Sequence, residues 1–100
     1  NLAFEGNDIY GNALAGIEII GDANPVIINN KVRDGKHYNS NGSNPVVRKN
    51  VISNNQHYAI YIYSNAGGTF EFNNLLGNGI DSWSISEDSE PNVIKNENTE

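Results

Sequence analysis

The sequence predicts an all-β fold, a parallel β-helix of about four rungs with three short strands in each rung. The motif Asn-x-apolar-x-x-Asn/Gly recurs, and its first residues are Asn7, Asn30, Asn50 and Asn73, with Asn96 as the expected start of a fifth copy. The steps between them are 23, 20, 23 and 23 residues. Within each unit, short stretches alternate between apolar and polar residues, which is typical of strands. Units of this length bury their apolar side chains by stacking on one another.

The apolar residues of each unit recur at the same offsets from its first asparagine. We therefore expect three columns of inward-facing side chains, one for each strand of the rung, with Phe4 belonging to a truncated unit before the first. The columns are Ile9, Val32, Ile52 and Leu75; Ile17, Ile60 and Trp83; and Ile27, Val47, Phe70 and Val93.

Asparagine is the most unusual feature of the composition, with 19 residues in 100. Asparagine is unfavourable within strands, but it tolerates the left-handed backbone conformation and makes local hydrogen bonds at turns. The first asparagines of the units should stack at one corner, where their amides can form a hydrogen-bonded ladder along the axis. A second corner should be formed by Asn12, Gly35, Asn55 and Asn78. These asparagines are interpreted as structural rather than catalytic.

Two segments depart from the repeat. The second unit is three residues shorter, and the polar sequence HYNSNGSNP (residues 37–45) replaces its middle alternating stretch. We expect this rung to lose a strand and to leave a gap. The last residues, KNENTE, contain no core side chain, so residues 93–100 are expected to be a frayed end of the single domain 1–100.

The stretches NDIYGNALAGIEI and NPVVRKNVISNNQHYAIYIYSNAGGTFEFN resemble the right-handed parallel β-helix repeats of the CASH (NosD-like) type, which include carbohydrate-binding proteins and sugar hydrolases. They are most similar to the β-helix region of F-box substrate-recognition subunits of ubiquitin ligases and to bacterial proteins with the same repeat. The resemblance covers nearly the whole chain and implies a right-handed coil. It is weak for function, because this repeat carries many functions. The F-box segment itself is not found in the sequence.

Composition excludes several classes of partner. The net charge of −6 and the pI near 4.7 argue against nucleic acids and anionic membranes as partners. There is no cysteine, no apolar run near the ~20 residues that cross a bilayer, and no recognisable signal peptide. The chain starts at Asn1 in the middle of a strand-like stretch, so we expect it to be a piece of a longer protein. The sequence leaves its cellular compartment open.

No catalytic constellation is found in the sequence, so we expect a protein that is not an enzyme and needs no cofactor. Glycosidases require two neighbouring carboxylates, and no two acidic residues share adjacent outward positions in the predicted register. His37 and His57 occupy equivalent positions of neighbouring units and are expected to stack at one corner. A two-histidine metal site there would need a third ligand, so we predict no metal site and keep the pair as candidate binding residues.

The candidate binding face is the outer side of the middle strands. Its residues are Glu18, Ile20, Tyr61 and Tyr63, and the two tyrosines are expected to lie beside the gap of the second rung. Tyrosine is common at protein interfaces, which predicts a non-catalytic module for protein recognition or scaffolding. A carbohydrate-binding or polysaccharide-degrading module is the alternative. Unpaired strands at the end rungs also predict self-association of the chain.

Overall fold

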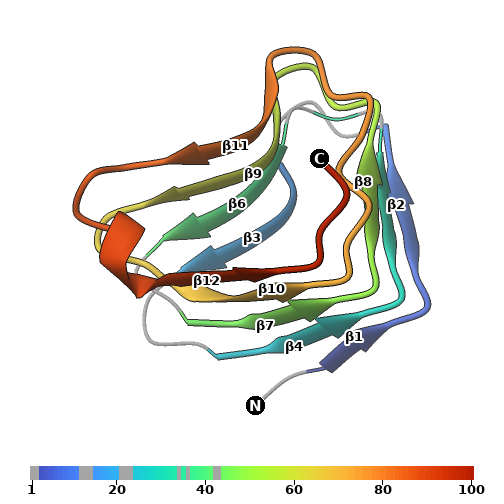
Figure 1. Cartoon of the computed structure of the whole chain (residues 1–100). Helices are drawn as coiled ribbons and strands as arrows, with labels where there is room; N and C mark the ends of the chain where they lie inside the picture. The colour runs from blue at the N-terminus through green and yellow to red at the C-terminus, as the bar shows by residue number, and fades with distance from the viewer. Residues whose placement is uncertain (1–2, 12–14, 21–23, 34, 36, 42–43) are drawn as a thin grey trace.

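The chain winds as a coil of short strands around one apolar core in the computed structural model (Figure 1), which describes residues 3–11, 15–20, 24–33, 35, 37–41 and 44–100. Successive turns of the coil, or rungs, stack their strands into three parallel sheets, which confirms the predicted β-helix. Sheet A contains β1 (Ala3–Glu5), β4 (Val26–Ile28), β7 (Val46–Arg48), β10 (Gly68–Glu71) and β12 (Val93–Asn96). Sheet B contains β2 (Asp8–Tyr10), β5 (Lys31–Arg33) and β8 (Val51–Ser53). Sheet C contains β3 (Ala15–Ile20), β6 (His37–Asn41), β9 (Tyr58–Tyr63) and β11 (Asp81–Ile85).

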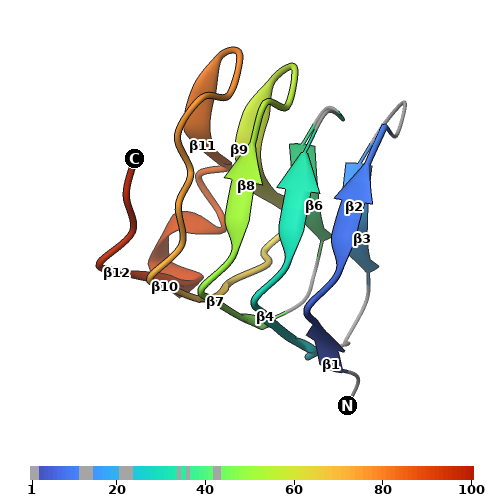
Figure 2. The same cartoon turned by 90° about the vertical axis from the view of Figure 1, so that its right-hand side faces the viewer.

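The rungs stack in register along the axis (Figure 2), and most of the predicted columns are confirmed. In sheet B, Ile9 pairs with Val32, which pairs with Ile52. Isolated bridges at Asn74 and Thr99 continue this sheet beyond β8. In sheet A, Phe4, Ile27, Val47 and Phe70 follow one another in the same way. In sheet C, Ile60 pairs with Trp83, whereas the side chain of Ile17 lies outside the described residues.

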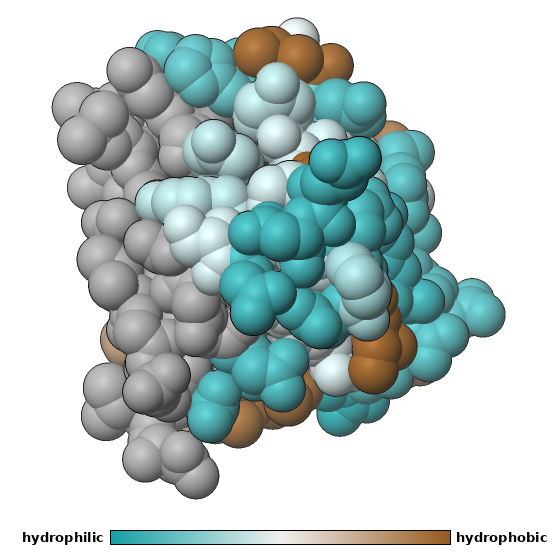
Figure 3. Space-filling model, turned by 90° about the vertical axis from the view of Figure 1, so that its left-hand side faces the viewer, coloured by the Kyte–Doolittle hydropathy of each residue, from teal (hydrophilic) through white to brown (hydrophobic). Residues whose placement is uncertain are grey.

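The core is a column of aliphatic side chains closed by two aromatic rings. The buried hydrophobic residues are Ile27, Val32, Val47, Ile52, Ala59, Ile60, Ile62, Ala66, Phe70 and Leu75. The rings of Phe70 and Trp83 meet edge to face with centroids 5.5 Å apart, a favourable geometry for aromatic pairs. On the outside, the face in Figure 3 is mainly hydrophilic over its described residues, with hydrophobic side chains in separate groups.

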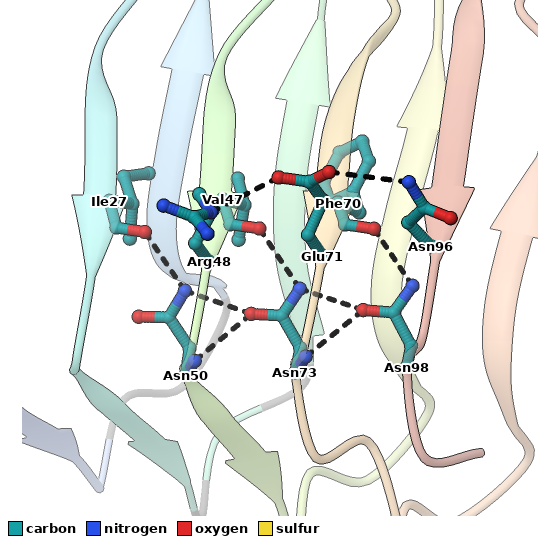
Figure 4. A network of polar contacts seen from close by, with 9 residues as sticks. All are labelled: Ile27, Val47, Arg48, Asn50, Phe70, Glu71, Asn73, Asn96 and Asn98. Atoms are coloured by element: carbon teal, nitrogen blue, oxygen red, sulfur yellow. Dashed lines mark hydrogen bonds and ion pairs between the residues drawn. The ribbon is translucent and has the colours of Figure 1, made fainter.

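The predicted asparagine ladder lies at the corner between sheets A and B (Figure 4). Asn73 Oδ1 accepts hydrogen bonds from the backbone N and from Nδ2 of Asn50, both at 3.0 Å, and the same pattern links Asn7 to Asn30 and Asn30 to Asn50. Each amide from Asn30 onward also donates to a carbonyl of the preceding rung, as Asn73 does to Val47 O at 3.0 Å. Because the amides of Asn30, Asn50 and Asn73 are buried, full hydrogen bonding is required to offset their desolvation.

One left-handed residue precedes each asparagine of this ladder. The φ angles are 70° at Gly6, 58° at Asn29, 57° at Lys49, 57° at Phe72 and 54° at Glu97. This conformation is uncommon for residues other than glycine. The stacking of the rungs therefore imposes it on Lys49, Phe72 and Glu97, which do not favour it by themselves. The corner therefore consists of two residues in every rung: one left-handed residue and one ladder asparagine.

The second rung does not lose its middle strand, so that prediction was wrong. Residues 37–41 form β6, which pairs in parallel with β3 on one side and with β9 on the other. Polar side chains do not prevent this pairing, because the hydrogen bonds of the sheet come from the backbone and the neighbouring rungs fix its geometry. The irregularity lies in the pairing of β3 with β6, where the register shifts between Ala15 and Glu18.

The last rung is longer than predicted, and two assignments were wrong as a result. Asn98, and not Asn96, occupies the ladder: its Oδ1 accepts from the backbone N and Nδ2 of Asn73 at 3.1 and 2.9 Å. In sheet A, Lys95 is paired with Phe70, whereas Val93 is paired with Gly68. The cause is the connection over residues 86–92, which contains the 3₁₀ helix η1 (Glu90–Asn92) and is longer than its counterpart at residues 64–67.

The segment 93–100 carries ordered pairings in spite of its polar sequence. β12 pairs with β10, and Leu75 N donates to Thr99 O at 2.8 Å. Lys95 Nζ lies 4.5 Å from the centroid of the Trp83 ring, so a cation covers the aromatic end of the core. In the structure, residues 93–96 belong to sheet A and Asn98 belongs to the ladder. The fraying of residues 93–100 stays a prediction.

Candidate recognition surface

Three tyrosines of β9 form a continuous aromatic surface on the outer side of sheet C, which we name the tyrosine face: Tyr58, Tyr61 and Tyr63. The rings of Tyr61 and Tyr63 have centroids 4.9 Å apart with an interplanar angle of 34°, and those of Tyr58 and Tyr61 are 6.1 Å apart at 42°. All three side chains are half-buried. They are held on a strand whose alternate residues, Ile60 and Ile62, are fully buried in the core, so the surface is rigid at its base.

On one side of β9, the strands β6 and β3 place the other predicted binding residues in line with the tyrosines. Glu18 pairs with Asn39, which pairs with Tyr61. In the next row, Ile20 pairs with Asn41, which pairs with Tyr63. The tyrosines therefore lie beside the strand β6 and not beside a gap. The side chains of Glu18 and Ile20 are outside the described residues, so only their positions in the sheet are fixed.

Tyr58 was missed as a member of the surface, because strand alternation assigns residue 58 to the same inner side as residues 60 and 62. In the structure its ring lies close to that of Tyr61. The only signal in the sequence was the density of tyrosine in YAIYIY, which does not reveal the direction of each ring.

On the other side of β9, the strand β11 presents small side chains and is bracketed by acidic residues. Ser84 pairs with Tyr61, and Asp81 at the start of β11 pairs with Tyr58. Glu87, Asp88 and Glu90 follow its end, all exposed. Asp88 is held in place because its Oδ1 accepts a hydrogen bond from Ser86 Oγ, and Ser86 Oγ also lies within hydrogen-bond distance, 3.1 Å, of Ser89 Oγ.

The two histidines are not stacked, which corrects the prediction for them. Tyr38 pairs with Ile60, so residue 37 aligns with residue 59 and not with residue 57. His57 lies just before β9, where its carbonyl oxygen accepts from Ile80 N at 2.6 Å, and the side chain of His37 is outside the described residues. Among the residues that the structure describes, no group of three or more His, Asp or Glu side chains is arranged to hold a metal ion.

The outer side of sheet B contains a separate charged cluster. Arg33 Nε and Nη2 bind the two carboxylate oxygens of Asp8, each at 3.0 Å, and its guanidinium lies 4.4 Å from the centroid of the Tyr10 ring. The hydrogen bond from Arg33 holds the pKa of Asp8 below its ordinary value. This exposed pair links β2 to β5 on the outside of the coil.

The comparison with known proteins identifies the family and nothing finer. No curated protein and no solved structure matches the chain. Among the described residues there is no helix with the length and apolar character needed to cross a membrane. Residues 1–99 match the family described as "Right handed beta helix region". Together with the coil of parallel strands and its asparagine ladder, this match shows that the chain belongs to the right-handed β-helix family.

Proposed function

We propose that this β-helix module is a non-catalytic recognition module in which a partner protein packs on the tyrosine face. The observation that carries the proposal is the cluster of three half-buried tyrosines on a strand anchored in the core. Tyrosine contributes a large contact area at low cost in conformational entropy, which is why it is enriched at protein interfaces. The resemblance to the β-helix region of F-box substrate-recognition subunits supports the same function.

The geometry favours a protein over a glycan as the ligand. A sugar ring stacks on one flat aromatic face, whereas neighbouring rings here are tilted by 34° and 42° and most of their surface is already covered. Tilted rings form a ridged surface that suits the side chains of another protein. A carbohydrate-binding module, which the CASH resemblance suggests, remains the competing function that the experiment must separate.

The experiment is affinity capture from host lysate with the wild-type chain and the Tyr61→Ala/Tyr63→Ala double variant, read by mass spectrometry. We expect at least one protein to be retained by the wild type and lost by the variant. Residues with equivalent exposure on another sheet provide the matched control, Val46→Ala/Thr69→Ala on the outer side of sheet A, which should retain the same protein.

Thermal melts of the three chains establish that each is folded before capture is compared. Equal retention by the wild type and by the tyrosine variant would refute binding at this face. Quenching of tyrosine fluorescence by a neutral oligosaccharide, without any protein partner, would instead support the carbohydrate-binding function.

A further inference from the structure

The net charge of the chain is confined to its second half. Residues 1–50 carry five acidic and five basic side chains, whereas residues 51–100 carry seven acidic side chains and one basic side chain. The seven acidic residues are Glu71, Asp81, Glu87, Asp88, Glu90, Glu97 and Glu100, and the basic residue is Lys95. The whole net charge of −6 therefore lies on the rungs from β8 onward.

The tyrosine face lies within this acidic half, and the adjacent strand brings carboxylates to both of its ends. Asp81 pairs with Tyr58 at one end. At the other end, Ser86 N donates to Ile62 O at 2.9 Å, so the turn with Glu87 and Asp88 begins beside the end of β9. Between these ends, the residues of β11 that alternate with the inward Trp83 are serines. Nothing bulky on β11 therefore separates the tyrosines from the acidic residues.

The described part of the chain already uses aromatic rings to hold cations at three places. Arg33 lies over Tyr10 and Lys95 over Trp83, with cation-to-centroid distances of 4.4 and 4.5 Å. Arg48 lies 5.8 Å from the centroid of Phe72. In two of the three, a carboxylate completes the arrangement: Asp8 binds Arg33 at 3.0 Å, and Glu71 Oε1 lies 3.1 Å from Arg48 Nε. Aromatic rings beside carboxylates bind cationic side chains by cation–π attraction and by charge.

We propose that the tyrosine face binds a segment of the partner protein that is rich in arginine and lysine. This inference rests on the proposed function and adds the chemical class of the partner. The cationic side chains stack on the rings of Tyr58, Tyr61 and Tyr63, and their charges are met by Asp81 at one end and by Glu87 and Asp88 at the other. Charge complementarity of this kind selects partners and accelerates their association at low ionic strength.

The test is fluorescence anisotropy with a labelled short peptide of alternating arginine and glycine as the probe. Peptides of glutamate and glycine, and of serine and glycine, serve as the comparison. We expect the arginine peptide alone to bind, with an affinity that falls as salt is added. The Tyr61→Ala/Tyr63→Ala variant should bind it about tenfold more weakly, since two cation–π contacts at exposed sites are lost.

Two triple variants with the same change in net charge distinguish binding at the tyrosine face from nonspecific electrostatic attraction to the whole chain. Asp81→Asn/Glu87→Gln/Asp88→Asn keeps the oxygen atoms that accept from Ser82 N and Ser86 Oγ while removing the charges beside the tyrosine face. Glu5→Gln/Glu97→Gln/Glu100→Gln removes as many charges from exposed positions outside sheet C. We expect about tenfold weaker binding in the first variant at low salt and little change in the second.

Equal weakening of peptide binding in both triple variants, or no effect of the tyrosine substitutions, would overturn the inference. The proposed function has a separate outcome. A partner captured by the wild type and lost by the tyrosine variant, but indifferent to the Asp81/Glu87/Asp88 variant, would leave protein recognition in place and refute a basic segment as the ligand.

Discussion

The corner between sheets A and B has the same length in every rung, whereas the corner between sheets C and A varies in length. The first has two residues in every rung: 6–7, 29–30, 49–50, 72–73 and 97–98. The second has five residues at 21–25, four at 42–45, four at 64–67 and seven at 86–92. All insertions are therefore kept away from the ladder corner. Residues 86–92 bring acidic residues to the end of the tyrosine face, and the ladder still continues at Asn98.

The difference follows from what each corner buries. At the ladder corner, the amides of Asn30, Asn50 and Asn73 are 1% exposed, and each depends on the rung before it and the rung after it. An added residue there would break hydrogen bonds on both sides. At the other corner the turn over residues 86–92 is bound mainly within itself, through Ser86 and Ser89. A corner that satisfies its own polar groups can vary in length, which is where solenoids accept new side chains for binding.

The largest loss of stability is expected from Asn73→Ala at the ladder corner. The substitution removes an amide that accepts from the backbone N and Nδ2 of Asn50 and donates to Val47 O and to Asn98 Oδ1. The buried backbone N of Asn50 loses its acceptor, and Val47 O and Asn98 Oδ1 each lose one donor. We expect the free energy of unfolding to fall by about 3–5 kcal/mol. Urea denaturation followed by circular dichroism measures the change.

Asn74→Ala is the matched control, because Asn74 is the next residue in the chain and is exposed. Its side chain accepts one local hydrogen bond, from Leu76 N at 3.2 Å, so the loss should stay below about 1 kcal/mol. If Asn73→Ala leaves no folded protein, Asn98→Ala at the last rung of the ladder provides a milder variant of the same kind. Similar losses for Asn73→Ala and Asn74→Ala would mean that the ladder does not hold the corner.

The corner between sheets B and C offers a smaller effect, at Gly79. A Cβ atom there would overlap the carbonyl oxygen of Gln56 on the preceding rung, so the rungs must separate locally to accept it. We expect Gly79→Ala to lower the free energy of unfolding by about 1–3 kcal/mol. Gly11 lies in the same corner of the first rung. A Cβ atom on Gly11 would have no other atom within 4 Å, but the φ angle of this residue is 69°.

Gly11→Ala therefore tests conformational strain without a steric overlap, and it should cost about 1 kcal/mol. Thermal unfolding of both variants measures the two losses. A loss at Gly11 as large as that at Gly79 would show that backbone conformation, and not the close approach of rungs, limits this corner.

The parts of the fold that the sequence predicts are those with a buried repeating residue. The column from Ile9 to Leu75 and the ladder from Asn7 to Asn73 could be read from spacing, because burial allows few alternatives at those positions. β6 was missed because HYNSN carries no apolar alternation, and its strand conformation is imposed by the rungs on either side. Asn98 was missed because counting residues cannot reveal that a polar turn has lengthened. At the candidate site, spacing predicted that Tyr61 and Tyr63 share one face, whereas the ring of Tyr58 depends on packing.

The smallest loss of stability is expected when an exposed ion pair is removed. This pair joins the same two rungs that the hydrogen bonds between Asn7 and Asn30 join. Asp8 on β2 and Arg33 on β5 form a bidentate ion pair at 3.0 Å on the outer side of sheet B. The hydrogen bond from Arg33 lowers the pKa of Asp8 from its ordinary value of 3.8. Because the pKa is lowered in the folded state, the pair contributes stability above this ordinary value and loses it as the pH falls through the folded value.

Arg33→Gln should therefore raise the pKa of Asp8 towards 3.8, which a nuclear magnetic resonance titration of its carboxylate measures. At neutral pH the loss of stability should be small and should shrink further with added salt, because exposed ion pairs are screened by water and ions. In strong acid the wild type and the variant should be equally stable, since Asp8 is then protonated in both. A loss comparable to that of Asn73→Ala would show that exposed charge pairs, as well as buried amides, hold the rungs together, and the contrast between the two kinds of contact would disappear.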